Sequence, residues 1–468
     1  MKSILRIALI FLMVACIPVA FAAADIEVAP VVSQEPVVEI QLDGANMQFK
    51  SGVRPYFDNT ANRTFVPFRD LFEAMGATVE YDAGTRMITA VRGDTTVQFS
   101  QDGTDIKLTK GTVVSTVVSD VTPITREDRV MVPVRFVCQA LGANVGWDQA
   151  NQTVVVIDTP TVIEDIMKDF TIIQKLNAIT PDYSKGSIKV DITADGKITT
   201  DGINIPFTMV METLANETHT DSKVTTTADL SALDDLDELE ELEGFTITDG
   251  KFSTSFDMLV DMGTLTYHYL SADINRLMGL ADGTWIKLSL TDLLALAGEE
   301  MPIDLNLIDA TTSDADALEL MLNQVPLTST EDYAELVAMM AIVKAAIGDQ
   351  AFKTNGNVLT AEYKIDSLTL VTTITLDSNG NAVSYKVAVA IKDETVDMTF
   401  EIAGTSDTLT VKMLIDAGDA AVEFNLAAKM TPSDAAPRTA PPAGAVIINV
   451  ADFFANLPMP LLPVATLS

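Results

Sequence analysis

Two short stretches of the chain carry apolar residues at the spacing of a helix that buries one face. The apolar positions follow the order i, i+3, i+4 and i+7: Phe68, Leu71, Phe72 and Met75 in the first stretch, and Val134, Val137, Cys138 and Leu141 in the second. Each stretch has a proline where its first turn begins and a glycine where it ends. The pattern therefore predicts two short helices, each with one face in a core.

An alternating pattern follows each predicted helix. Residues 77–91 and 143–157 alternate apolar and polar side chains around a polar four-residue turn, which predicts two hairpins. All landmarks of the two regions differ by 66 positions, which predicts two copies of one structural unit. The landmarks are Arg63, Pro67, Arg69, Gly76, Tyr81 and Asp82 in the first copy, and Arg129, Pro133, Arg135, Gly142, Trp147 and Asp148 in the second. Because one copy of about 60 residues buries only a marginal core, we expect the two copies to pack as a pair.

The shared motif is R-x-x-V-P-x-R, then a short helix, G-A-x-V and an aromatic residue before aspartate. This motif resembles the copper amine oxidase N-terminal-like, or stalk, domain over about residues 37–158. The resemblance implies a small antiparallel sheet wrapped on a helix, in an exported protein of a Gram-positive-type bacterium. In that family catalysis belongs to another domain, with three histidine copper ligands and a tyrosine-derived quinone. This chain has only His219 and His268, so we expect no copper oxidase site.

Two interpretations are open for the paired landmarks. Arg69 and Arg135 are either clamps for an anion or structural donors to local carbonyls and to the paired aspartates. Tyr81 and Trp147 are either platforms for a sugar or covers of their hairpins. The structural interpretation is favoured in both cases, and Cys138, on the core face of its helix, is expected to be a buried, inert thiol.

The second part of the chain has the pattern of half-buried antiparallel strands. Residues 187–198 and 202–214 alternate around a turn placed at Asp195-Gly196. Five further alternating segments follow between residues 358 and 430, one of which contains a hairpin turn at Asn379-Gly380. A helix is predicted over 328–348, opened by Thr328 and Glu331 at capping-box spacing. The expected fold is α+β: two small antiparallel sheet-plus-helix repeats, then a large antiparallel β-meander, as a half-barrel or curled sheet packed with helices. The order of elements is similar to exported half-barrel carriers of the LolA and LppX type.

The two ends of the chain predict processing and organisation. Residues 1–24 read as a signal peptide, because Lys2 and Arg6 precede an apolar run and Ala20-Phe21-Ala22 fits a cleavage site; lipidation of Cys16 is the alternative. The predicted bounds are a linker at 25–36, repeats at 37–104 and 105–158, an acidic β-rich domain at 159–431, a Pro/Ala-rich connector at 432–445 and an apolar element at 446–468. After cleavage only one cysteine remains, and we expect no transmembrane segment.

Charge separates the two parts. The net charge is −36, residues 23–159 carry 11 basic and 18 acidic side chains, and residues 160–468 carry −31. Such an acidic surface repels nucleic acid and anionic lipid headgroups.

The sequence offers no recognisable catalytic chemistry. Zinc-protease, serine-hydrolase and phosphate-loop motifs are absent, and the acidic residues 228–245 and 377–381 lack the EF-hand spacing of a calcium site. Met209 and Met211 are either soft ligands for Cu(I) or flexible core filling, and the second is favoured. We therefore expect no catalytic residue, cofactor or metal.

The expected function is that of an exported, non-catalytic cell-envelope protein. Its repeats would be a docking or spacer module and its acidic domain a binding module, with a cell-wall polymer or another envelope protein as partner. A carrier that sequesters an apolar, lipid-like ligand is the alternative, and an unrecognised hydrolase is a third possibility.

Overall fold

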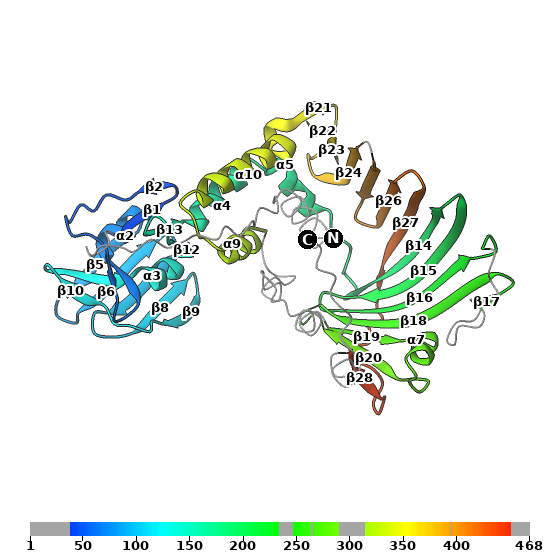
Figure 1. The fold of residues 1–468 in the computed structure, drawn as a ribbon, viewed down its shortest axis with the longest axis horizontal. Coiled ribbons are helices and arrows are strands. Elements are labelled where there is room, and N and C mark those ends of the chain that lie inside the picture. Colours follow the sequence, from blue (N-terminus) through cyan, green and yellow to red (C-terminus); the bar gives the residue numbers. More distant parts are fainter. Residues whose placement is uncertain are drawn as a thin grey trace. The chain divides into compact units, whose positions relative to one another are not determined.

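The computed structural model describes residues 38–233, 247–262, 264, 266–289, 314–393 and 395–450. Residue contacts divide the chain into two compact units, and Figure 1 labels their elements. The repeat unit consists of the described residues within Phe11–Asp169 and Thr312–Ile342. The sheet unit consists of the described residues within Phe170–Thr311 and Val343–Ser468. Nothing in the sequence pattern indicated that an internal segment belongs with the repeats.

Several predictions concern parts of the chain outside the described residues. They are the signal peptide, Cys16, the linker, most of the acidic segment 228–245 and residues 451–468 of the apolar element. The predicted domain bounds stay predictions.

Each copy in the repeat unit contains the predicted helix and hairpin. The helices are α2 (Phe68–Ala74) and α3 (Val134–Ala140), and the hairpins are β5 (Thr78–Asp82) with β6 (Met87–Arg92) and β12 (Asn144–Asp148) with β13 (Thr153–Ile157). Gly76 and Gly142 have φ values of 78° and 82°, the left-handed conformation that suits glycine after a helix. The offset of 66 therefore predicted both copies correctly.

The copies are joined through a shared sheet. Strands β4 (Arg63–Pro67) and β11 (Arg129–Pro133) pair antiparallel, flanked by β3 (Tyr56–Asp58) and β10 (Ile124–Arg126). Val66 lies opposite Val132, its equivalent in the other copy. Both valines are fully buried. The copies thus pair through equivalent residues, as the expected packing of two marginal cores requires.

Two further sheets complete the repeat unit. One has the order β12-β13-β1-β2, in which β1 (Glu39–Leu42) runs parallel to β13 and β2 is Ala45–Asn46. The other is a five-stranded antiparallel sheet formed by β5, β6, β7 (Thr95–Ser100), β8 (Asp105–Lys110) and β9 (Val113–Val118). The second copy therefore takes a strand from the beginning of the repeat unit, whereas the first copy continues into a longer meander.

One hydrophobic core links both copies. It includes Leu71 and Phe72 of α2, and Val137 and Cys138 of α3. Burial raises the pKa of the Cys138 thiol, which keeps it protonated and unreactive. Three more helices belong wholly or partly to this unit: α4 (Thr159–Lys168), α9 (Asp314–Gln324) and the beginning of α10 (Asp332–Ile347). Helix α9 contacts α4 and β12.

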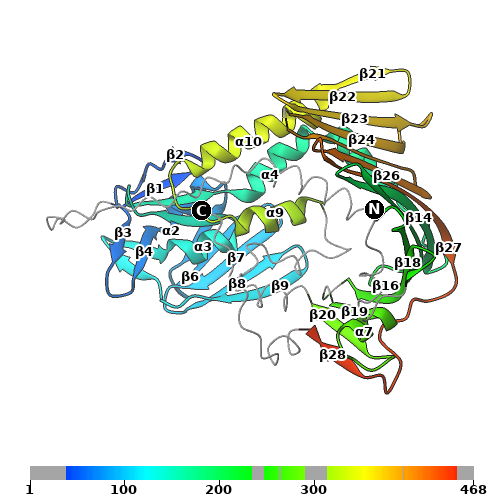
Figure 2. The ribbon, with the colours of Figure 1, turned by 45° about the vertical axis from the view of Figure 1, so that its right-hand side comes forward.

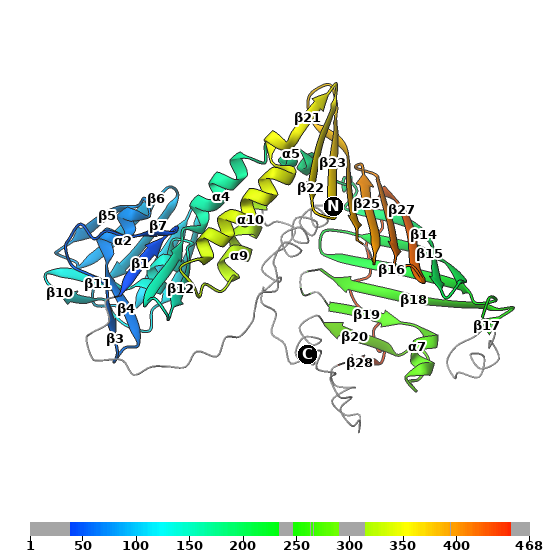
Figure 3. The same ribbon diagram turned by 45° about the horizontal axis from the view of Figure 1, so that its top comes forward.

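The sheet unit is built on one sheet of fifteen strands. Figure 2 shows that this sheet curves along its strand order, and Figure 3 shows its central strands side by side. The strands follow the order β21 (Phe352–Asn355), β22 (Val358–Ile365), β23 (Leu368–Leu376), β24 (Ala382–Lys392), β25 (Asp397–Gly404), β26 (Thr408–Asp416), β27 (Ala420–Ser433), β14 (Ser187–Thr200), β15 (Ile203–Ala215), β16 (His219–Asp229), β18 (Lys251–Asp261), β19 (Thr266–Leu270), β20 (Trp285–Ser289) and β28 (Ile447–Asn449), with β17 (Ile247–Thr248) beside β18. The expected α+β class with a large curled sheet is confirmed.

Short helices contact this sheet. They are η1 (Lys175–Ala178), α7 (Ala272–Leu277) and η3 (Asp349–Ala351), while α5 (Thr171–Gln174) contacts η1 and η3. Helix η1 contacts β24, η3 contacts β22, and α7 contacts β18. The predicted helix over 328–348 begins at Asp332, whose carboxylate accepts the N–H groups of Thr328 and Ser329. The predicted Thr328–Glu331 capping box is therefore wrong.

The turn predicted at Asp195-Gly196 is also wrong. Strand β14 continues through Gly196, and the chain turns at Asp201 and Gly202, which have φ values of 51° and 80°. A Cβ atom at Gly196 would lie 2.3 Å from Cζ of Phe207 and 2.4 Å from the Glu423 carbonyl oxygen. The glycine thus makes room within the sheet for an aromatic ring and a close neighbouring strand.

Candidate functional site

The first landmark of each copy is an arginine at the start of a strand. Arg63 forms an ion pair with Asp120, with Nε 3.3 Å from Oδ1, and its Nη1 donates to the Asn62 carbonyl. Arg129 donates only to the carbonyl of Asp128, at 3.3 Å. Arg63 thus links its strand to Asp120, 57 residues further along the chain, whereas the contact of Arg129 is with its own neighbour.

The second arginine pair is not symmetric. Arg69 Nη1 donates to the Val79 carbonyl at 3.0 Å, so it ties α2 to its hairpin, and it lies 3.6 Å from Glu73. Arg135 is exposed, and within the part of the chain that the structure describes it has no hydrogen bond or ion pair. Neither arginine contacts the paired aspartates.

The aromatic and aspartate landmarks belong to the hairpins. Tyr81 donates to Gln101 at 2.9 Å, while Trp147 stacks on Phe57 with ring centroids 6.3 Å apart. Asp82 caps its own turn, and hydrogen bonds from Thr85 and from the Gly84 amide lower its pKa. The geometry matches hairpin covers and turn caps.

Asp148 has an additional partner from outside its copy. Its carboxylate accepts hydrogen bonds from the Asn151 amide and, at 2.9 Å, from the Thr330 N–H. Burial would raise its pKa, but these hydrogen bonds outweigh burial and lower it.

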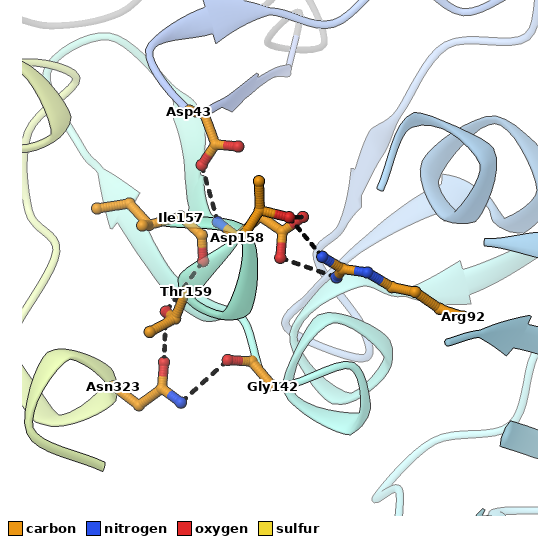
Figure 4. Close-up of polar contacts among 8 residues, drawn as sticks. Asp43, Arg92, Gly142, Ile157, Asp158, Thr159 and Asn323 are labelled. Carbon is orange, nitrogen blue, oxygen red and sulfur yellow. Dashed lines mark hydrogen bonds and ion pairs between the residues drawn. The ribbon is translucent and has the colours of Figure 1, made fainter. Parts of the chain in front are cut away.

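A buried polar network that sequence reasoning missed joins the copies to α4 (Figure 4). Arg92, at the end of β6, forms an ion pair of 2.8 Å with Asp158, whose side chain is only 6% exposed. The Asp158 N–H donates to Asp43 at 2.8 Å, and Arg92 also donates to Thr161. Burial raises the pKa of Asp43, the Asp158 N–H lowers it, and the Asp158 charge raises it further. Arg92 and Asp158 are 66 positions apart, so opposite charges at equivalent positions were the signal that could have revealed the pair.

Helix α9 adds a further member to this network within the repeat unit (Figure 4). The Thr159 hydroxyl donates to Asn323 at 2.7 Å, and the Asn323 amide donates to the Gly142 carbonyl at 3.0 Å. The network therefore fixes the beginning of α4 to both copies and to α9. The Arg92–Asp158 ion pair and these hydrogen bonds are the contacts expected of a structural framework.

The last residues of α9 and those that follow it lie along the edge of β12, and we call Leu322–Thr330 the strap. The Asn144 amide donates to the carbonyls of Leu322 and Val325 at 2.8 and 2.7 Å, and the Trp147 N–H donates to the Leu327 carbonyl at 3.2 Å. A Cβ atom at Gly146 would lie 1.9 Å from that carbonyl oxygen. The first copy has Thr78 and Glu80 where the second has Asn144 and Gly146. Only the second copy therefore has both the amide donor and the space that contact with the strap requires.

The two faces of the large sheet differ in chemistry. Phe207, Phe400, Met413 and Phe424 lie on one face and are half-buried, and the rings of Phe207 and Phe424 stack at 6.3 Å. We call this the apolar face. The opposite face carries threonines and charged pairs such as Lys197–Glu423, with 2.8 Å between the charged atoms. Both faces follow the alternation that the sequence predicted.

The opposite face carries a groove of about 450 Å³ across β23 to β27. Small residues, Ala388 and Ala390, are among its lining residues, together with Val371 and Leu414. Its polar lining residues are Thr369, Thr399, Glu401, Lys412, Glu423 and Asn425. Lys412 lies directly opposite Glu401 and Asn425 on the neighbouring strands. The groove thus offers the Lys412 ammonium group and threonine hydroxyls to a polar ligand. Its carboxylates and amide already have protein partners, since Glu401 pairs with Lys386, Glu423 pairs with Lys197 and Asn425 donates to Asp195.

The Pro/Ala-rich segment is anchored to the sheet by Arg438. Its guanidinium donates to both carboxylate oxygens of Asp221 at 2.8 and 2.7 Å and lies 3.3 Å from Asp257. Burial would raise the pKa of Asp221, but the hydrogen bonds and charge of Arg438 lower it.

The described ranges contain neither a metal-binding cluster nor a membrane-spanning helix. No group of three or more His, Cys, Asp or Glu residues there could hold a metal ion, and no described helix is long and apolar enough to cross a membrane. His219 contacts Thr218, and the pKa of His268 is lowered by burial and by the nearby Lys287 charge, with Asp261 acting against them.

Comparisons with known proteins identify the N-terminal part. The sequence model of the copper amine oxidase N-terminal domain matches residues 41–156 and, in a second overlapping match, residues 110–228. No curated protein matches the chain. Two solved structures show weak similarity. Pseudomonas putida OprB at low pH has 7% sequence identity and a TM-score of 0.14, and the match covers 53% of this chain and 93% of that chain. MucB in complex with MucA has 9% sequence identity and a TM-score of 0.07, and the match covers 58% of this chain and 95% of that chain. Scores this low carry no argument about the sheet unit. The N-terminal part of the chain therefore contains a tandem copper amine oxidase N-terminal-like repeat.

Proposed function

We propose that the protein is an exported, non-catalytic component of the cell envelope that binds a polar wall polymer. The repeat unit is its docking or spacer module, and the groove on the large sheet is its binding site. The observation that carries this proposal is the match to an N-terminal domain family that has no catalytic role of its own. The buried network supports a spacer role, because paired charges within the repeat unit favour a fixed geometry over a reactive one.

The chemistry of the groove favours a polymer with hydroxyl, carboxylate and amino groups. Lys412 would meet a carboxylate of the ligand, and Thr399 would bind a hydroxyl. Glu401 and Glu423, which pair with Lys386 and Lys197, would accept further hydrogen bonds from ammonium or amide donors of the ligand. Peptidoglycan offers all of these groups on one polymer.

A sedimentation assay with purified peptidoglycan tests the proposal. We expect the full chain to sediment with the polymer and Lys412→Ala to bind about tenfold more weakly, because one charge-assisted contact is lost. Lys429→Ala is the matched control, since Lys429 is exposed on the same face of β27 but does not line the groove. A full chain that remains in the supernatant with excess peptidoglycan would reject wall binding.

The apolar face favours a second candidate, a carrier of a lipid-like ligand. Half-buried aromatic and methionine side chains form a continuous surface there, as ligand sites for apolar molecules require. Native mass spectrometry of protein purified without detergent tests this function, with a bound apolar molecule as the expected result. Val411→Arg on the apolar face should abolish binding, and Thr410→Arg on the opposite face should not. A ligand-free mass together with no uptake of an apolar fluorescent probe would exclude the carrier.

A further inference from the structure

Strand β9 is an unusual edge of the five-stranded sheet in the repeat unit. It has the sequence VVSTVV, and no charged residue lies between Lys110 and Asp120. Val113, Val114 and Val118 are 68%, 58% and 62% exposed. Only Val117 packs against the core. The strand is therefore apolar, β-branched and open on its outer side.

The direction of the backbone groups follows from one hydrogen bond. The Ser119 N–H donates to the Thr104 carbonyl at 2.8 Å, on the side of β8. Because backbone groups of successive strand residues point to opposite sides, the N–H and C=O groups of Val114, Thr116 and Val118 point away from β8. Strand β9 is the last in its sheet, and in the part of the chain that the structure describes no strand pairs with this side.

The other edges of comparable strands are protected. At the opposite end of the same sheet, β5 carries Glu80 and Asp82, charges that discourage pairing with another strand. In the second copy the edge of β12 is met by the strap through Trp147 and Leu327. Strand β9 has neither a charge nor a strap, so its edge is available for pairing.

We propose that β9 is a dimerisation edge that pairs antiparallel with β9 of a second copy of this chain. In an antiparallel pair, residues whose backbone groups point toward the partner strand lie opposite each other. A two-fold axis at Thr116 satisfies this condition and places Thr116 opposite Thr116 of the second copy. Val114 then faces Val118 in both directions. This register joins β-branched pairs and a threonine pair on one face, the combinations that stabilise antiparallel strands. The pairing joins the two five-stranded sheets into one.

Charge decides the conditions under which the dimer forms. The chain carries −36, so two copies repel each other, whereas residues 111–119 contribute no charge to the contact. Added salt screens the repulsion and leaves the apolar and hydrogen-bonded contact intact. We therefore expect dimerisation to strengthen as the salt concentration rises, the opposite of a contact made by ion pairs.

Sedimentation velocity of the full chain over a concentration series tests the proposal. The expected result is a monomer–dimer equilibrium whose dissociation constant rises about tenfold or more in Thr116→Lys, because two ammonium groups then lie directly opposite each other. Val91→Lys is the matched control: Val91 is 42% exposed in β6 of the same sheet, but β6 is an interior strand. It should dimerise like the unaltered chain.

A second variant tests the backbone contact itself. Thr116→Pro removes an outward N–H, which an edge strand tolerates, and should also prevent dimerisation while the melting temperature stays close to that of the unaltered chain. Hydrogen exchange should show protection of the Val114, Thr116 and Val118 amides that increases with protein concentration. A chain that is monomeric at all protein and salt concentrations overturns the proposal. Binding of an extended peptide to β9 would not rescue it, because the proposed partner is a second copy of the chain. A dimer that persists unchanged in both Thr116 variants overturns it as well, because the interface then lies elsewhere.

Discussion

Replacing Gly146 by alanine should release the strap from the second copy. The new methyl carbon would lie 1.9 Å from the Leu327 carbonyl oxygen and 2.4 Å from its Cβ, far inside van der Waals contact. Because the closest atom belongs to the backbone, a side-chain rotation cannot relieve the clash. The strap must move outward, and the hydrogen bond from the Trp147 N–H must lengthen or break.

The expected cost follows from what the strap loses. Leu327 is 7% exposed, and exposing a buried leucine costs about 1.5–3 kcal/mol. Each hydrogen bond lost with it contributes about 1 kcal/mol, and those of Asn144 and Thr330 are within reach of the displacement. We therefore expect Gly146→Ala to reduce the free energy of unfolding of the repeat unit by about 2–5 kcal/mol.

Urea denaturation of the full chain, followed by circular dichroism, measures this change. Gly103→Ala is the matched control, because a Cβ atom at Gly103 has only an ordinary contact of 3.5 Å with Ser100. Hydrogen exchange should rise at the amides of Trp147 and Thr330 in the first variant only. Equal stability of both variants, with unchanged exchange over the strap, would refute the close approach and the reasoning built on it.

Four other substitutions test separate contacts. Arg69→Ala should cost about 1 kcal/mol in urea denaturation because a hairpin carbonyl loses its donor, whereas Arg135→Ala should change stability by less than about 0.5 kcal/mol; equal effects would contradict the asymmetry. Gly196→Ala should destabilise the sheet unit by about 1–3 kcal/mol in the same assay, since its methyl group overlaps a packed ring, and an unchanged midpoint would count against that packing. Asp148 has a lowered pKa in the folded state, so its stabilisation is present above the ordinary value of 3.8 and is lost as the pH falls through the folded value. The stability difference between the unaltered chain and Asp148→Asn should therefore shrink in acid, and a difference independent of pH would show that the carboxylate is not the acceptor.

The repeat was predictable because its signals are local. Helical spacing, the proline and the glycine specify α2 and α3, and alternation specifies the two hairpins. These patterns show which face of an element is buried, but they do not show which element covers it. Hydrophobic periodicity does not specify which strands pair over long range. The pairing of Val66 with Val132 and the parallel pairing of β1 with β13 could therefore not be predicted from it.

The mistaken turn at Gly196 has a related cause. Asp-Gly between alternating segments is a strong turn signal, but the glycine serves the packing of Phe207 from the next strand. The candidate sites show the same limit. The alternation predicted a sheet with one apolar and one polar face, while the groove depends on which side chains five strands bring together. The strap was invisible because its contacts with Asn144 and Asp148 span 178 to 182 residues.

The strap also affects the order in which parts of the chain can fold during synthesis. Residues 144–148 leave the ribosome long before residues 322–330, so the newly made second copy must wait with an open strand edge while much of the sheet unit is synthesised. The repeat unit therefore cannot be completed until the first segment of the sheet unit, residues 170–311, has been synthesised. Contacts of such sequence separation close slowly, and during that interval the open edge is exposed to other chains. A translation pause or a bound chaperone in this interval would favour correct maturation, and a truncated chain that ends before the strap would be prone to aggregate.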